Sequence, residues 1–147
     1  MKSFKSLAIV FIAAVVGAQA ERHTVHLENR CGFGTPTLIQ GPNTLSTGND
    51  FTINGNCLFN GERCTLIETT LKNPTSPGGG SSTDISLIPP HAFSVTSGFR
   101  YSNGCDGAGH TCDNANCDTA FHKFDDNGVQ VACQVNDVLY VPMPWNR

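Results

Sequence analysis

Apolar and polar residues alternate in short segments along most of the chain. The alternation is strictest near the end, where Val129, Val131, Cys133 and Val135 hold a period of two. Alternating or short apolar, β-prone runs occupy Val25–Leu27, Phe51–Ile53, Cys64–Lys72, Ile85–Ile88, Ala92–Thr96, Val129–Val135 and Val138–Val141. A period of two predicts half-buried β-strands, and the 15 glycines and 8 prolines of the chain mark turns between them. The pattern therefore predicts an all-β sandwich or barrel, with no convincing amphipathic helix.

The first twenty residues follow a different pattern. Lys2 and Lys5 precede an uninterrupted run of apolar residues and glycine from Leu7 to Gly17, and Ala18-Gln19-Ala20 fits a small-x-small cleavage site. These three parts predict a secretory signal peptide over residues 1–20. The apolar run is too short to cross a hydrocarbon layer of about 30 Å. We therefore expect a secreted, extracellular protein that has no membrane association after cleavage.

The remainder, Glu21–Arg147, has the length of a single domain. Its low-complexity stretch is Pro74–Ser82, with the sequence PTSPGGGSS. Such a stretch is typical of a linker between domains or of a loop between strands. We predict the loop, because the segments on each side are too short to fold separately.

All 7 cysteines of the chain lie between Cys31 and Cys133. In an exported chain such cysteines predict disulfides rather than metal ligands. The segment from Cys105 to Cys133 is rich in Asp, Asn and Gly, so cross-links rather than burial are expected to order it. An odd number leaves one cysteine without a partner in the chain, and the spacing alone does not decide the pairing.

Five short motifs follow one another in a recognisable order. They are Asn29-Arg30-Cys31, Leu45–Ile53, Thr65–Leu71, Asp84–Leu87 and Gly104-Cys105, with two more cysteines close behind. In order and character they resemble the thaumatin-like proteins, and most of all the small secreted fungal members often labelled only as glycopeptides. The resemblance covers most of the mature chain. It implies a flattened, disulfide-stapled thaumatin-like β-sandwich over Glu21–Arg147 that lacks the second, disulfide-rich domain of larger members.

The resemblance also implies a candidate site. Larger members have an acidic cleft, formed by one Arg, one Glu and three Asp, that is linked to binding and sometimes slow cleavage of β-1,3-glucans. Glu68 matches the Glu and Asp84 matches one Asp, whereas Pro89 stands at a second Asp position and the Arg and the last Asp have no counterpart. Glu68 and Asp84 are therefore the candidate carbohydrate-binding residues, and no catalytic residue is assigned.

The family's pattern further implies a disulfide pairing. The implied pairs are Cys57 with Cys64, Cys105 with Cys133, and Cys112 with Cys117. In the family the counterpart of Cys31 bonds a cysteine that closes the final strand, but this chain ends Val141-Pro-Met-Pro-Trp-Asn-Arg147. Cys31 is therefore expected to be an unpaired thiol or to link two chains in a dimer.

Metal sites are not predicted. Zinc would need His110 and His122 together with Cys112 and Cys117, but structural zinc prefers close CxxC-type pairs and none is present. Calcium would find oxygen ligands, though no DxDxDG loop, among Asp106, Asp113, Asp118, Asp125 and Asp126. His23 could hold copper only if trimming made it the N-terminus. We expect no cofactor.

The sequence narrows the function only to a few classes. The chain has a net charge of −3 and its basic residues are scattered, which argues against nucleic acid as a partner. The first hypothesis is a non-catalytic protein that binds cell-wall polysaccharide (β-glucan) or acts at the host or environmental interface. The alternatives are a weak β-1,3-glucan hydrolase that uses Glu68 and Asp84, and a protease-resistant structural or effector-like cell-wall protein.

Overall fold

The computed structural model describes residues 22–31, 35–47, 57–135 and 138–143 of the chain. Within these ranges it contains nine strands and no helix, so the predicted all-β class is confirmed. The strands are β1 (Thr24–Asn29), β2 (Thr37–Gln40), β3 (Asn43–Thr47), β4 (Leu66–Thr70), β5 (Ser81–Ser86), β6 (Ser97–Ser102), β7 (Gly109–Cys112), β8 (Val131–Cys133) and β9 (Val138–Met143). None of the described segments forms a helix long and apolar enough to span a membrane. The predicted signal peptide and the strand expected at Phe51–Ile53 lie outside the described residues.

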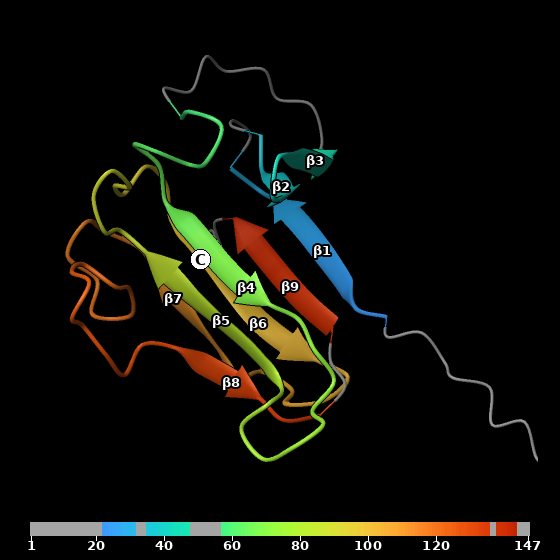
Figure 1. Cartoon of the computed structure of the whole chain (residues 1–147). Helices are drawn as coiled ribbons and strands as arrows, with labels where there is room; N and C mark the ends of the chain where they lie inside the picture. Colours follow the sequence, from blue (N-terminus) through green and yellow to red (C-terminus); the bar gives the residue numbers. More distant parts are fainter. Residues whose placement is uncertain (1–21, 32–34, 48–56, 136–137, 144–147) are drawn as a thin grey trace, which may run out of the picture.

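The strands form three sheets (Figure 1). The largest has the order β1-β9-β6-β7, and all its pairings are antiparallel except the parallel pair of β1 with β9. The second sheet has the order β4-β5-β8 and is antiparallel throughout. In Figure 1 it lies in front of β6 and β7 as a second layer. The third sheet is the hairpin of β2 with β3.

The core lies between the two larger sheets. Phe99 and Tyr101 of β6 alternate with outward residues, and they are buried together with Leu139 of β9 and Ile85 of β5. Small buried residues complete the inner face of β5, so that the sheets can approach closely; these are Ser81 and Thr83. The predicted alternation of apolar and polar residues is therefore the pattern that separates the core from the outer faces.

A chain of hydroxyl groups joins the two layers within this core. The Oη atom of Tyr101 lies 2.7 Å from Oγ1 of Thr83 and donates a hydrogen bond to the carbonyl oxygen of Val131 at 3.3 Å. Oγ1 of Thr83 lies 2.7 Å from Oγ1 of Thr69 in the neighbouring strand. A buried hydroxyl that lacks a partner is costly, so this chain is what allows Thr83 to occupy the core.

Several strand boundaries differ from the predicted ones. Ser81 and Ser82, predicted to end a loop, begin β5 because they pair with Cys133 and Ala132 of β8. β8, at Val131–Cys133, is shorter than the predicted run Val129–Val135.

The prediction of a strand at Ala92–Thr96 is wrong. The segment is irregular, and β6 begins only after it. The amide of Ala92 donates to the carbonyl of Cys64, and the amide of Ser94 donates to Oγ1 of Thr65. Because loop and side-chain acceptors already satisfy these amides, the apolar side chain of Phe93 packs against the core without a strand around it.

Candidate functional site

Glu68 and Asp84 face each other across two neighbouring strands. They are directly opposed in the antiparallel register of β4 and β5, between the pairs Ile67–Ile85 and Thr69–Thr83, whose β5 members Ile85 and Thr83 are fully buried. Side chains alternate across a sheet, so Glu68 and Asp84 lie on the outer face. Opposed residues have Cβ atoms about 4.5–5.5 Å apart. The register thus brings the two residues implied by the resemblance together on one surface.

The two carboxyl groups have different surroundings. Glu68 is exposed, whereas Asp84 is only 8% exposed. Gln130, which precedes β8, donates from Nε2 to Oδ2 of Asp84 at 3.4 Å. The other oxygen, Oδ1, is buried and has no hydrogen-bond partner. A buried carboxylate oxygen without a partner is unusual, because the desolvation of a charged group is costly unless it is compensated.

These surroundings shift the titration of Asp84. Burial raises the pKa of Asp84 above its ordinary value, the negative charge of Glu68 raises it further, and the hydrogen bond from Gln130 partly lowers it. At a pH just above the ordinary pKa of an aspartate, Asp84 of the folded chain therefore keeps a proton that it has lost in the unfolded chain. Stability consequently falls as the pH rises through this window, so the ionised Asp84 destabilises the fold at neutral pH.

The rest of this face is mixed: Leu66 of β4 and Ala132 of β8 share it with several polar residues. On β5, Ser82 and Ser86 share the face of Asp84, and on β4 Thr70 shares the face of Glu68. The Oγ atom of Ser82 is buried without a hydrogen-bond partner, as is Oδ1 of Asp84. The face therefore offers hydrogen-bonding groups that are not satisfied within the described part of the chain. Below, "the acidic face" means Glu68, Thr70, Ser82, Asp84 and Gln130.

Three disulfides are present, and they are the pairs that the resemblance implied. They join Cys57 with Cys64, Cys105 with Cys133, and Cys112 with Cys117. The second bridge is the one with the longest loop. It ties the turn between β6 and β7 to β8, and therefore holds the two large sheets together.

Cys31 is free, as expected, and partly buried directly after β1. Burial raises the pKa of its thiol, and a hydrogen bond to its own backbone acts in the opposite direction. A thiol with a raised pKa forms less thiolate, which makes it a weaker nucleophile at neutral pH. The dimer that Cys31 was expected to allow stays a prediction.

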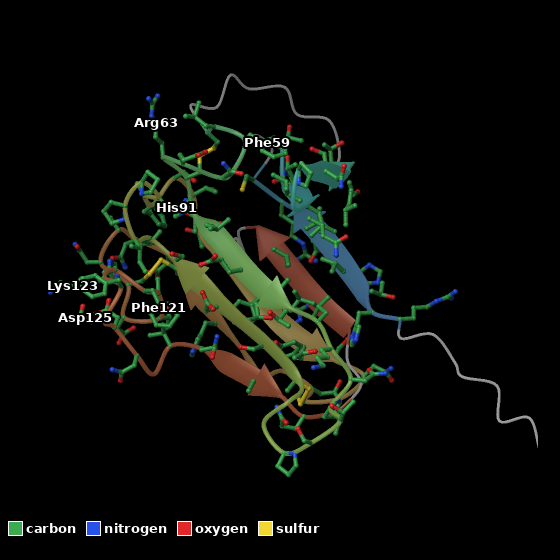
Figure 2. All side chains as sticks on the ribbon, in the orientation of Figure 1. Phe59, Arg63, His91, Phe121, Lys123 and Asp125 are labelled. Atoms are coloured by element: carbon green, nitrogen blue, oxygen red, sulfur yellow. A yellow bond between two sulfur atoms is a disulfide. The ribbon has the colours of Figure 1, made fainter. Side chains whose placement is uncertain are left out.

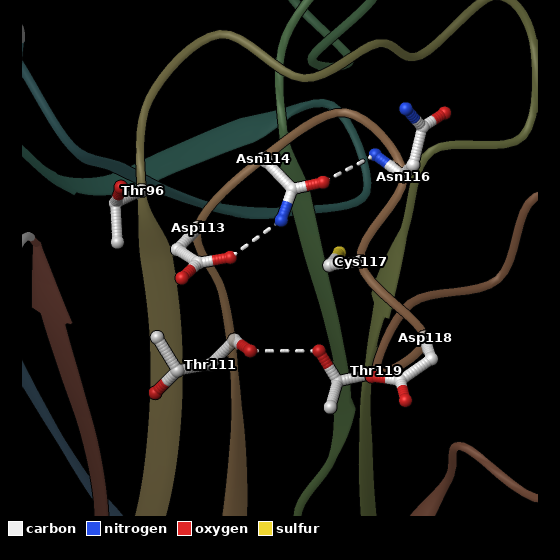
Figure 3. Close-up of a pocket in the computed structure, with 8 residues that line it drawn as sticks. All are labelled: Thr96, Thr111, Asp113, Asn114, Asn116, Cys117, Asp118 and Thr119. Carbon is white, nitrogen blue, oxygen red and sulfur yellow. Dashed lines mark hydrogen bonds between the residues drawn. The ribbon is translucent and has the colours of Figure 1, made fainter.

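A polar hollow of about 710 Å³ lies beside the third disulfide (Figure 3). Its lining includes Thr96 and Thr111 together with Asp113, Asn114 and Asp118. The loop is braced by its own hydrogen bonds: Asn114 donates to Asp113 at 2.7 Å, and the amide of Asn116 donates to Oδ1 of Asn114 at 2.8 Å. The sequence pattern does not predict this hollow, since no aliphatic pattern marks it.

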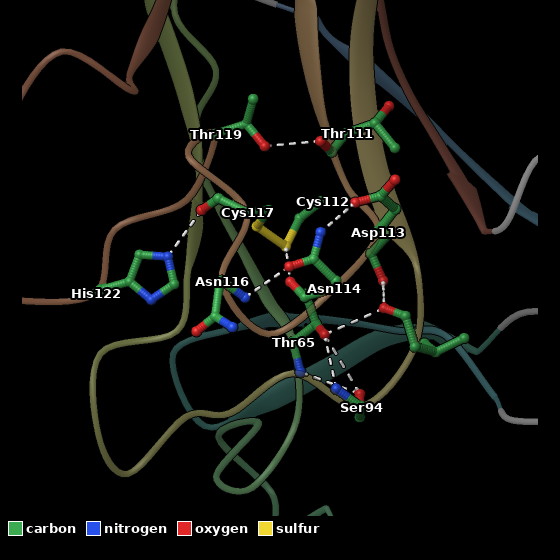
Figure 4. The surroundings of a disulfide bond; sticks show 12 residues. Thr65, Ser94, Thr111, Cys112, Asp113, Asn114, Asn116, Cys117, Thr119 and His122 are labelled. Atoms are coloured by element: carbon green, nitrogen blue, oxygen red, sulfur yellow. Dashed lines mark hydrogen bonds between the residues drawn. A yellow bond between two sulfur atoms is a disulfide. The ribbon is translucent and has the colours of Figure 1, made fainter.

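The residues considered for zinc have other roles in the structure. Cys112 and Cys117 are bonded to each other, and Nε2 of His122 lies 2.8 Å from the carbonyl oxygen of Cys117 (Figure 4). The ring of His110 contacts the ring of Phe99 edge-on, with 6.2 Å between centroids. Across the described ranges no three His, Cys, Asp or Glu side chains converge as metal ligands.

Two of the aspartates considered for calcium brace turns instead. Asp106 accepts from the amide of Asn103 at 2.9 Å, and Asp126 accepts from the amides of His122 and Lys123 at 2.7 and 2.9 Å. The bonds from these two amides lower the pKa of Asp126.

The same turn displays an aromatic side chain that sequence reasoning missed. Phe124 is 93% exposed within the turn that Asp126 braces. Lys123 and Asp125, its neighbours in the chain, lie at the periphery of the molecule, away from the strands (Figure 2). An aromatic residue inside a polar segment gives no periodic signal, so its exposure could not be predicted from the pattern.

Comparisons with known proteins give no further guidance. A scan against models of protein families found no match. Searches of curated proteins and of solved structures likewise found no similar protein. The functional argument therefore rests on the residues described above.

Proposed function

We propose that the chain is a secreted, non-catalytic, thaumatin-like protein that binds β-glucan of a cell wall through its acidic face. Three features support this. The strands form two facing sheets, the disulfides are those that the resemblance implied, and no described helix could span a membrane. The single observation that carries the proposal is the register of β4 and β5, which sets Glu68 opposite Asp84.

The acidic face suits a polyhydroxylated ligand. A carboxylate accepts hydrogen bonds from sugar hydroxyl groups, and bonds to a charged group are stronger than neutral ones. Glu68 is exposed and therefore accessible to such a ligand, and Gln130 donates a hydrogen bond to Asp84 opposite it.

The test is retention on insoluble β-1,3-glucan. We expect the wild-type protein to be retained and Glu68→Gln to bind about 10–100-fold more weakly, because it loses hydrogen bonds to a charged acceptor. Asp125→Asn is the matched control, since it removes one exposed negative charge from a peripheral turn, and it should bind like the wild type. The proposal is wrong if the wild-type protein passes through beside a known binder, or if Glu68→Gln is retained equally well.

One observation favours a second candidate function, slow glucan hydrolysis. Retaining glycosidases use a protonated acid and an ionised carboxylate about 5–5.5 Å apart. Asp84, whose pKa is raised by burial, lies opposite the exposed Glu68. Release of reducing sugar that both Glu68→Gln and Asp84→Asn abolish would establish this activity. A protein that resists proteases but neither binds nor cleaves glucan would instead be structural or effector-like.

A further inference from the structure

Phe121 extends the sheet of β4, β5 and β8 by one residue. It forms an isolated parallel bridge with Ser86, the last residue of β5. The amide of Phe121 donates to the carbonyl of Ile85, and the amide of Leu87 donates to the carbonyl of Phe121, both at 2.8 Å. Paired residues of neighbouring strands direct their side chains to the same face of a sheet. Phe121 therefore lies on the outer face, together with Ser86 and Asp84.

The side chain of Phe121 is half-buried but does not belong to the core. It is not one of the partly buried hydrophobic residues that pack against the core cluster. Figure 2 shows Phe121 next to β5. The ring thus has apolar surface that the core does not use and that a ligand can cover.

Groups that form hydrogen bonds occupy the next row of the same face. The antiparallel register of β8 against β5, continued by one residue, places Gln130 opposite Asp84, and its Nε2 atom donates to Oδ2 of Asp84. Glu68 completes this row from β4. Two residues of a strand span about 7 Å, which is therefore the step along the sheet from Phe121 to Gln130.

The charge of these two rows is negative. Their described residues are Leu66, Ser86 and Phe121 in one row and Glu68, Asp84 and Gln130 in the other. The rows contain no basic residue among these six, so they disfavour an anionic partner. They suit a neutral partner that has both an apolar surface and hydroxyl groups.

We infer, on the basis of the proposed glucan binding, that Phe121 stacks against a glucose ring and determines the specificity of the acidic face. The free hydroxyl groups of β-linked glucose are equatorial, so each face of the ring presents C–H groups and the rim presents hydroxyl groups. Phe121 covers one face, and the exposed Glu68 accepts from the rim. Asp84 is a positioning residue, because it binds Nε2 of Gln130 and leaves Oε1 of that exposed amide to accept as well.

The test is the binding of a soluble β-1,3-gluco-oligosaccharide, followed by titration calorimetry. We expect Phe121→Ala to bind about 10-fold more weakly than the wild-type protein, and Phe121→Tyr to bind like it. Phe121→Leu keeps an apolar side chain but loses the flat ring, so it should bind nearly as weakly as Phe121→Ala. Phe124→Ala is the matched control and should bind normally, since it removes a phenylalanine that is 93% exposed in a peripheral turn.

NMR adds a readout that a merely structural role of Phe121 would not move. Protons of a sugar ring that lies over an aromatic face resonate upfield, and we expect this shift with the wild-type protein and its loss in Phe121→Leu. The wild-type shift keeps the test decisive if the variants fold poorly. If the wild-type protein does not bind the oligosaccharide, the proposed function fails and the inference fails with it.

Two results would overturn the inference alone and leave the proposed function standing. One is wild-type binding that Glu68→Gln weakens but Phe121→Leu does not, without an upfield shift of the sugar protons. The other is equal affinity for a manno-oligosaccharide, because the axial hydroxyl group of mannose disturbs one face of the ring and should weaken stacking.

Discussion

Replacing Cys105 and Cys133 together by alanine is expected to lower the free energy of unfolding by about 3.5 kcal/mol. The bridge joins residues 28 positions apart, so its removal raises the conformational entropy of the unfolded chain. It also links the β6–β7 turn to β8, and Cys133 is fully buried, which adds a small cavity to the loss. The measurement is denaturant unfolding, in a Cys31→Ser background so that no free thiol exchanges with the bridges.

The third disulfide supplies the control for this prediction. Cys112 and Cys117 are separated by only 5 positions, so their replacement should cost about 2 kcal/mol on the same loop-entropy argument. If removal of the longer bridge proves no more costly than removal of the shorter one, the second bridge does not hold the two sheets together as described.

Tyr101→Ala is expected to destabilise the protein by about 4 kcal/mol. The side chain is fully buried between the sheets, and its ring contacts Phe99 edge-on with 6.2 Å between centroids. Truncation to alanine removes a large apolar volume, and core substitutions of aromatic residues to alanine typically cost about 3–5 kcal/mol. It also removes one of the two hydrogen-bond partners of the Thr83 hydroxyl and leaves Thr69 as the other.

Tyr101→Phe separates the two contributions. It keeps the ring but removes the hydroxyl that bonds Thr83 and Val131, so we expect a loss of about 1–2 kcal/mol. Phe124→Ala, an aromatic truncation at a residue that is 93% exposed, should change stability by less than about 0.5 kcal/mol. Denaturant midpoints measure all three variants. A loss below 1 kcal/mol for Tyr101→Ala would mean that Tyr101 is not at the centre of the core.

The strands that pair to bury apolar side chains were the ones the sequence predicted best. β1 and β9 contain predicted runs, β4 and β8 lie within them, and β5 overlaps one only at Ile85 and Ser86. β6 was missed although Phe99 and Tyr101 alternate with outward residues, because Ser97, Gly98 and Ser102 dilute the apolar signal. β7 contains no predicted run either. Gly109 makes a close backbone approach to Phe99 possible, and a Cβ atom there would lie 2.0 Å from the Phe99 carbonyl oxygen.

The candidate site could be predicted only in part. The resemblance pointed to Glu68 and Asp84, but nothing in their spacing of sixteen positions reveals that they are opposed. That depends on the length of the connection between β4 and β5, which sets their register. Gln130, which contacts Asp84, lies directly before β8 and 46 positions further along the chain. Such long-range contacts leave no local pattern in the sequence.

The central claim is that Asp84 is a buried acid whose charge is opposed by Glu68. Side-chain carboxyl titration by NMR, in chelator, tests it directly in the wild-type protein and in Glu68→Gln. We predict that Asp84 titrates above its ordinary pKa in the wild type, and that its pKa falls in Glu68→Gln but stays raised by burial. A titration of Asp84 at its ordinary value in both proteins would contradict the account.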